Sequence, residues 1–347
     1  MSLFYVIISE SNNTQPFKNL IIMQMLNLPR KIKFVLHHPS IIISINPRKK
    51  LSEIRSTLYK IDVYETMRFI SHMKQNFPYS INSSNTPKLN RLCSLEDWNN
   101  EEIRQIFSEL HHPPVIIHRK AWEFAMGVLA MKRFNKLNDK CTAIGIGTGI
   151  EPIPFYLANK VKHVYATDLY GKTKGWNKEA PHTFLDNPKK YAPFPYKEDA
   201  LTVLRMDGTK LEFPSETFDI AFSFSSIEHF GGKDHSGALK SMKEIERVLK
   251  PGGIAVIATE YIINDKDHPE YFNKKTIYSD LIDKLDSLKL VEPLDLRITT
   301  KTLDTVLEWH EALDNSDDEE FAKSHPYLLL NLKNLLFISV MLVFKKQ

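Results

Sequence analysis

Residues 142–152 read TAIGIGTGIEP. The first five residues form an apolar run suited to a buried strand, and the proline at the end fits the first turn of a helix over Pro152–Asn159. Between strand and helix, Gly145, Gly147 and Gly149 let the backbone turn tightly and approach a ligand with no Cβ in the way. The start of such a helix also offers unpaired N–H groups and the positive end of its dipole. A glycine loop in this place predicts a nucleotide-type binding site.

Strands and helices alternate after this loop. Strands are expected at His163–Thr167, Thr202–Met206, Phe218–Ser223 and Ile254–Thr259, with an amphipathic helix at Ala238–Leu249. This order is typical of a parallel sheet covered by helices. Near the C-terminus, Leu294–Thr299 and Leu335–Phe344 read as an antiparallel pair on the sheet edge. The predicted fold class is α/β, a Rossmann-like, seven-stranded, mostly parallel sheet with an antiparallel C-terminal edge strand and an N-terminal helical extension.

The regular pattern begins near residue 95, and we expect one domain over residues 91–347. Two helices open it, at Glu102–Leu110 and His118–Asn135, where apolar residues recur at helical spacing. Asp97 is placed to cap the first of them.

Residues 1–90 do not read as a complete domain. Short β-branched runs, beginning with Tyr5–Ile8, are separated by polar residues and prolines, and a helical stretch follows at Leu51–Gln75. We expect this part to be an extension of the domain that follows it.

Composition limits the classes of function. The formal net charge is +4, but residues 1–60 hold nine Lys and Arg against two Asp and Glu, so the rest of the chain is slightly acidic. No nucleic-acid partner is therefore expected. No apolar run of about 18 residues predicts a membrane span, and no signal peptide is expected. Two cysteines without a CxxC pair suit reduced thiols in a cytoplasmic protein. The oligomeric state cannot be deduced.

The class of cofactor is inferred from the glycine loop and from the residues that end the next two strands. A dinucleotide-binding site typically has the sequence GxGxxG, whereas the GxGxG found here is suited to a methionine-derived cofactor. Asp168 ends the following strand, where its carboxylate can accept both hydroxyls of a ribose from either cofactor. Asp207 and Gly208 end the third strand, where an acidic side chain can meet the adenine amino group. A plain Asp-Gly turn explains that pair nearly as well.

Several segments resemble the class I S-adenosylmethionine-dependent methyltransferases. The segments that carry the resemblance are HRKAWE (118–123), GTGIEP (147–152), ATDL (166–169), SSIEHF (225–230) and LKPGG (249–253) with Thr259-Glu260. They are most similar to a bacterial and archaeal subgroup associated with sugar and cell-surface glycan pathways. The resemblance covers about residues 115–345. It implies S-adenosylmethionine as cofactor, with Leu169 and Ser225 among the residues that bind it.

One departure from that family concerns the methionine end of the cofactor. Many members carry an acidic residue two positions before the first glycine, where this chain has Ala143. Glu151, just beyond the loop, is the candidate to replace it.

The acceptor expected from the resemblance is a small molecule or a sugar or glycan hydroxyl, and such an acceptor needs a base. His229 is the first candidate because it follows the fourth strand, with Glu228 and Glu260 next. Contact with adenine or a structural role explains His229 equally well. The aromatic-rich segment Tyr170–Tyr196 is expected either to cover the acceptor site or to pack on the surface.

Other functions compete with this interpretation. A nicotinamide-dependent oxidoreductase shares the strand-loop-helix pattern but lacks its third glycine here, where Ile150 stands. A protein that binds the cofactor without turnover is a further alternative. Base methylation of nucleic acids lacks its usual sequences, and we identify no set of metal ligands.

Overall fold

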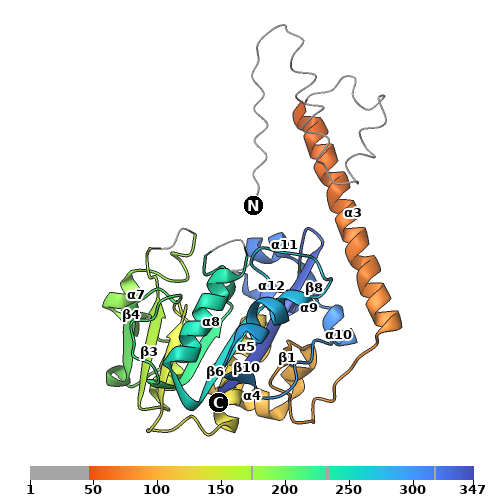
Figure 1. Ribbon diagram of the computed structural model, residues 1–347. Helices are drawn as coiled ribbons and strands as arrows, with labels where there is room; N and C mark the ends of the chain where they lie inside the picture. Colours follow the sequence, from red (N-terminus) through yellow and green to blue (C-terminus); the bar gives the residue numbers. More distant parts are fainter. Residues whose placement is uncertain (1–46, 173–174, 232–233, 316–317) are drawn as a thin grey trace, which may run out of the picture. The chain divides into compact units, whose positions relative to one another are not determined.

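The computed structural model describes residues 47–172, 175–231, 234–315 and 318–347 (Figure 1). The chain divides into two units, Met1–Lys60 and Ile61–Gln347. Helix α3 (Pro47–Asn76) agrees with the helix predicted at Leu51–Gln75. The β-branched runs predicted within residues 1–46 lie outside the described residues. No helix in the described part of the chain is long and apolar enough to cross a membrane.

Five parallel strands form one half of a mixed sheet, in the order β4-β3-β2-β5-β6. They are β2 (Thr142–Ile146), β3 (His163–Asp168), β4 (Leu201–Arg205), β5 (Phe218–Phe224) and β6 (Leu249–Ile262). The chain leaves β2 toward β3 and returns to its other side at β5. Such a reversal of strand order opens a crevice at the carboxyl ends of the strands, where ligands bind in open α/β sheets.

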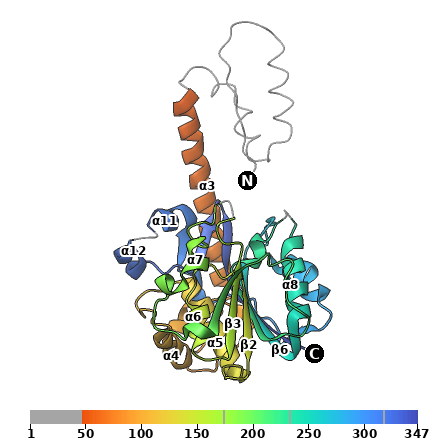
Figure 2. The same cartoon turned by 90° about the vertical axis from the view of Figure 1, so that its left-hand side faces the viewer.

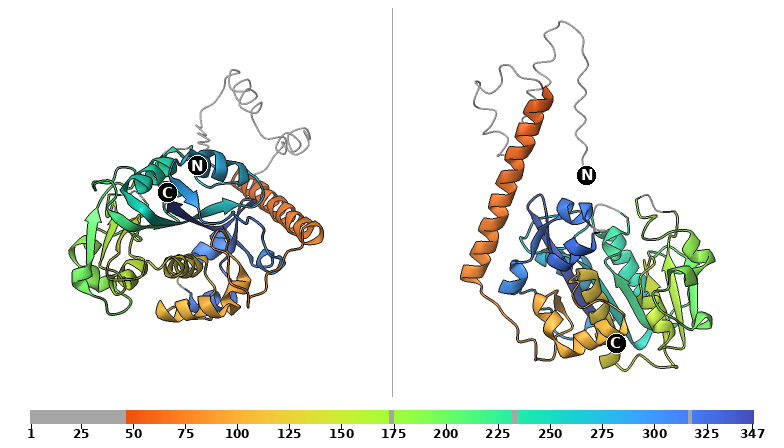
Figure 3. Two further views of the ribbon diagram at one scale, coloured as in Figure 1. Left: turned by 60° about the horizontal axis from the view of Figure 1, so that its bottom comes forward. Right: turned by 180° about the vertical axis from the view of Figure 1, so that it is seen from behind.

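The other half of the sheet is built on β10 (Leu335–Lys346), which is antiparallel to β6 (Figure 3). Three short strands pair with β10: β1 (Arg91–Leu92), β7 (Leu288–Leu290) and β9 (Leu329–Leu332). A fourth, β8 (Val306–Glu308), runs parallel to β9. The sheet therefore has ten strands in the described residues, not the predicted seven. The mostly parallel α/β class is confirmed, but β10 lies inside the sheet because the short strands cover its outer edge.

The strand predicted at Leu294–Thr299 is wrong. This segment makes one isolated bridge, between Asp295 and Arg91, and no strand. Thr299 instead caps the short helix α10 (Thr300–Leu303), because its side chain accepts the N–H of Thr302.

Helices cover both faces of the sheet (Figure 2). On one face lie α4 (Glu101–Glu109), α5 (Arg119–Arg133) and α6 (Ile153–Ala158), and on the other lies α8 (Ser236–Val248). Smaller helices are α7 (Thr183–Asp186), α9 (Lys274–Thr276), α11 (Trp309–Asp314) and α12 (Glu319–Ser324). The strands β5, β6 and β10 are almost entirely buried, which explains why they read as continuous apolar runs, whereas β4 at the sheet edge is only partly buried.

The cap of α4 differs from the prediction. Asn100, not Asp97, accepts the N–H of Ile103, at 3.2 Å. Asp97 lies buried in a 3₁₀ turn, where it pairs with Arg91 and accepts the indole N–H of Trp122 at 2.6 Å. Burial raises the pKa of Asp97 and Arg91 opposes this. Its role is to tie the turn to α5 rather than to start α4.

Candidate active site

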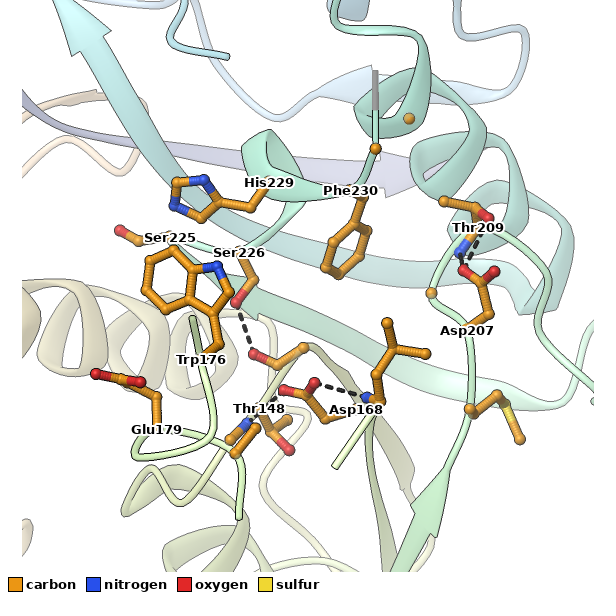
Figure 4. Close-up of a pocket in the computed structure, with 18 of the residues that line it drawn as sticks. Thr148, Asp168, Trp176, Glu179, Asp207, Thr209, Ser225, Ser226, His229 and Phe230 are labelled. Carbon is orange, nitrogen blue, oxygen red and sulfur yellow. Dashed lines mark hydrogen bonds between the residues drawn. The ribbon is translucent and has the colours of Figure 1, made fainter. Parts of the chain in front are cut away.

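A cavity of about 800 Å³ opens at the carboxyl ends of β2, β3, β4 and β5 (Figure 4). Its wall comes from the loops after these strands, from residues 176–180, and from the first turns of α8. Predicted residues that line it are Gly147, Gly149, Glu151, Asp168, Leu169, Asp207, Gly208, Ser225 and His229. Gly145, Glu228 and Glu260 do not line it. The fold thus gathers residues that lie up to 82 positions apart in the sequence.

The glycine loop passes close to its neighbours at two positions. Gly147 and Gly149 have φ angles of +67° and +47°, a region that side chains with a Cβ rarely adopt. A Cβ on Gly147 would lie 2.7 Å from the Cβ of Ser226, and one on Gly149 would lie 2.5 Å from the carbonyl oxygen of Glu179. Ser226 also donates its hydroxyl to the carbonyl of Gly147 at 2.7 Å. Only glycines let this loop keep its path along the cavity.

Asp168 stands at the end of β3 and faces the loop. Its Oδ2 accepts the N–H of Gly149 at 2.9 Å and its Oδ1 accepts the N–H of Leu169 at 2.6 Å. Burial raises the pKa of Asp168, and the two N–H groups oppose that effect. Each carboxylate oxygen retains further acceptor capacity toward the cavity.

Asp207 and Gly208 form a tight turn after β4. Asp207 accepts the N–H and the hydroxyl of Thr209, both at 2.8 Å, which is the turn that the sequence offered as the alternative. Gly208 packs beneath Phe230, where a Cβ would lie 2.4 Å from the ring. Phe230 is a cavity residue for which the sequence predicted no role, and in the view of Figure 4 its ring lies between His229 and Asp207.

Glu151 forms an ion pair with Lys120, which was also given no role in the sequence analysis. Lys120 Nζ lies 2.7 Å from Glu151 Oε1 and 2.7 Å from the carbonyl oxygen of Phe224. Burial raises the pKa of Glu151 to about 7, although Lys120 opposes this. Burial also opposes the charge of Lys120, but Glu151 and Glu123 raise its pKa. Within the described part of the chain, Glu151 Oε2 is buried and lacks a hydrogen-bond partner.

His229 lies on the cavity wall against three side chains. Its Nδ1 is 3.1 Å from Glu270 Oε2, and its ring packs against Trp176 with centroids 4.8 Å apart (Figure 4). The ring of Tyr271 meets it edge-on at 6.3 Å. No local pattern could have indicated these partners, because they lie 41 to 53 positions away.

Ser225 adopts a left-handed φ of +47°. Its hydroxyl donates to Glu123 Oε1 at 2.8 Å and accepts from Arg119 Nη1 at 3.1 Å. Glu123 is fully buried at the centre of this group, and Ser339 also donates to it. The HRKAWE segment thus supplies a buried ion pair, between Arg119 and Glu123, that contacts Ser225 on the cavity wall.

Glu228 and Glu260 are buried in the same region. Arg119 Nη1 lies 2.6 Å from Glu260 Oε1, and the hydroxyl of Thr259 donates to Glu228 Oε2 at 2.9 Å. Burial and the facing Glu260 carboxylate raise the pKa of Glu228, while burial opposes ionisation of Glu260 but Arg119 holds its pKa low. Of the two carboxyl groups, Glu228 therefore holds a proton more readily than Glu260. Neither side chain lines the cavity that holds His229.

One part of the segment Tyr170–Tyr196 packs against the domain, and another part lines the cavity. Phe184, Tyr191 and Phe194 pack with Tyr170 in a cluster of their own. Residues 176 and 178–180 reach the cavity.

Residues 143–257 match a protein family described as Methyltransferase domain. The glycine loop, Asp168, Asp207 and His229 all fall inside the matched range. The match identifies residues 143–257 as similar to methyltransferase domains, and it supports an S-adenosylmethionine-dependent methyltransferase with S-adenosyl-L-methionine as cofactor.

A sterol 4-C-methyltransferase from Caenorhabditis elegans is 28% identical over 143 residues, which are 41% of this chain and 38% of that relative. The match thus spans little more than a third of the relative's length. A phosphoethanolamine N-methyltransferase from Haemonchus contortus, solved with S-adenosylhomocysteine, is 16% identical with a TM-score of 0.43, covering 78% of this chain and 61% of its own. A TehB-like methyltransferase from Corynebacterium glutamicum is 15% identical with a TM-score of 0.38, covering 72% and 98%. None of these three is described as acting on a sugar or glycan.

Proposed function

We propose that this protein transfers a methyl group from S-adenosylmethionine to a hydroxyl of a small molecule, with a sugar or glycan precursor as the acceptor class. The observation that carries the proposal is the position of His229 on the wall of the same cavity as the glycine loop and Asp168. Residues 91–347 form the catalytic domain, and residues 1–90 extend it. Both cysteines, Cys93 and Cys141, are unpaired and buried, which is consistent with a cytoplasmic location.

The cavity fits the cofactor at each of its ends. Asp168 holds the ribose hydroxyls, and Asp207 meets the adenine beside Leu169. Glu151 receives the methionine ammonium group, since its Oε2 is buried without a partner in the described structure and a buried carboxylate gains from a cationic ligand. Gly147 and Gly149 leave the space that a Cβ would fill.

The bound cofactor supplies an activated methyl group, so the protein has to position the acceptor and remove its proton. His229 acts as the general base, because imidazole exchanges protons near neutral pH. Glu228 and Glu260 do not line the cavity, so they have a structural role, held by Thr259 and Arg119 respectively.

Turnover of the His229→Ala variant tests this function. Hydroxylated sugars and small metabolites are screened as acceptors with methyl-labelled cofactor. We expect His229→Ala to lower kcat by about 10²–10⁴-fold, because a positioned base contributes that much, with the affinity for S-adenosylhomocysteine nearly intact. His325→Ala, at an exposed histidine, is the control. Turnover that survives in His229→Ala would move the base elsewhere, and weaker cofactor binding with little loss of rate would make His229 a cofactor contact.

A further inference from the structure

The segment after β6 brings a carboxylate to His229. Glu270 Oε2 lies 3.1 Å from His229 Nδ1. The other ring nitrogen, Nε2, is not part of this contact. A carboxylate only accepts hydrogen bonds, so Nδ1 must carry the proton in this contact. Among the described residues, Nε2 of His229 makes no hydrogen bond. The contact therefore leaves the lone pair of the neutral ring on Nε2.

The backbone around Glu270 is firmly held. His268 Nδ1 accepts the N–H groups of Glu270 and Tyr271, at 3.2 and 3.0 Å. Phe272 is fully buried and its N–H donates to the carbonyl of Glu260 at 3.1 Å, while Ile262 donates to the carbonyl of Phe272 at 2.7 Å. The segment runs beside β6, so the position of Glu270 is set by the sheet.

The ring of His229 is held by packing as well. Trp176 contacts it at 4.8 Å, with an angle of 37° between the rings, and Tyr271 meets it at 70°. Two aromatic contacts and one hydrogen bond restrict both χ angles of the side chain. Such a restriction matters because a base must lie within hydrogen-bond reach of the proton that it takes.

We infer that Glu270 is a positioning residue that holds His229 in the Nδ1–H tautomer and directs Nε2 at the acceptor hydroxyl. This inference rests on the proposed function. The acceptor oxygen bonds to the methyl carbon as the methyl–sulfur bond breaks, and that electron pair goes to sulfur. The hydroxyl proton goes to Nε2, and the resulting imidazolium is stabilised by Glu270.

Other charged groups also face His229. Glu260 is ionised and buried nearby, and His268 and Tyr271 lie on the same segment as Glu270. Glu228 is next to His229 in the chain, and burial together with the Glu260 carboxylate raises its pKa. Among the described carboxylates, Glu270 is the one that hydrogen-bonds to the His229 ring, so its removal should change the tautomer directly.

The tautomer can be measured without an acceptor. Histidine labelled with ¹⁵N is incorporated into the full-length protein, S-adenosylhomocysteine is added, and the His229 signals are assigned by their loss in His229→Gln. We expect the Nδ1–H tautomer in the wild type. In Glu270→Ala the Nε2–H form, which free histidine prefers, should dominate. An Nε2–H form in the wild type, or an unchanged spectrum in Glu270→Ala, would overturn the inference.

Kinetics with an identified acceptor give the second readout. Glu270→Gln should lower kcat about tenfold, and its effect is modest because this side chain is 44% exposed and water screens it. Glu311→Gln, at an exposed glutamate, is the control.

The results for the two variants distinguish the role of Glu270 from the role of His229 as the base. A wild-type kcat in Glu270→Gln, with a large loss in His229→Ala, would refute the role of Glu270 and leave the proposed function intact. Full turnover in His229→Ala would refute the base itself. Unchanged binding of S-adenosylhomocysteine in both variants shows that the fold and the cofactor site survive.

Discussion

The affinity for the cofactor should depend on pH through Glu151. Burial raises the pKa of this carboxyl to about 7, so it is largely protonated at pH 6 and largely ionised at pH 8. An ammonium group binds the ionised form. Below the pKa the protein must therefore release a proton on binding, and each pH unit costs about a factor of ten in affinity. Above the pKa this cost disappears, so affinity rises with pH.

The magnitude follows from that pKa of about 7. Roughly a tenth of Glu151 is ionised at pH 6 and nine tenths at pH 8, so the Kd of S-adenosylhomocysteine should fall roughly tenfold between them, or about 1.4 kcal/mol. Isothermal titration at both pH values in the wild type and in Glu151→Gln measures the effect. The amide resembles a carboxyl that cannot release its proton, so the variant should bind more weakly than the wild type at both pH values, and the ratio of its Kd to the wild-type Kd should rise roughly tenfold from pH 6 to pH 8.

The variant also controls for other titrating groups. Asp168 lines the same cavity and its pKa is raised by burial. Its contribution appears equally in wild type and Glu151→Gln and cancels in the ratio of their Kd values. A ratio that stays constant from pH 6 to pH 8 would refute the assignment of Glu151 to the ammonium group.

Three further substitutions test the site and its support. Asp168→Ala should weaken S-adenosylhomocysteine binding by about 2–3 kcal/mol, since hydrogen bonds to a charged group contribute about 1.5–3 kcal/mol each and do not simply add; an unchanged Kd by titration would limit Asp168 to its loop contacts. Gly149→Ala should lower stability by about 1–2 kcal/mol through its left-handed φ and its contact with Glu179, and should weaken ligand binding, as thermal melts with and without ligand will show. Arg119→Ala should cost about 3–5 kcal/mol in chemical denaturation because it leaves Glu260 buried without its partner, and wild-type stability would contradict that account.

The parallel half of the fold could be predicted because each strand there is an apolar run between turn signals. Thr142–Ile146 was predicted with the same bounds that the structure shows. In the other half, the long apolar run Leu335–Phe344 correctly predicted β10. The strands β1, β7, β8 and β9 could not be predicted, since they are two to four residues long and give no periodic pattern. Leu294–Thr299 looked like a strand from its composition alone, yet the capping bond of Thr299 directs the chain into α10.

Site residues that end parallel strands could be predicted, because the carboxyl ends of neighbouring strands meet at one edge of the sheet. Lys120 and Trp176 line the same cavity from a preceding helix and a long loop. Glu270 approaches His229 from beyond β6. Such contacts depend on tertiary packing, and no spacing within the sequence encodes them.

The central claim is that the cavity at the ends of β2 to β5 binds S-adenosylmethionine. Isothermal titration of the full-length protein with S-adenosylhomocysteine, NAD and NADP tests this claim most directly. The structure and the family match predict binding of S-adenosylhomocysteine at micromolar Kd or tighter and no binding of either nicotinamide cofactor. Binding of NAD or NADP without any response to S-adenosylhomocysteine would contradict it.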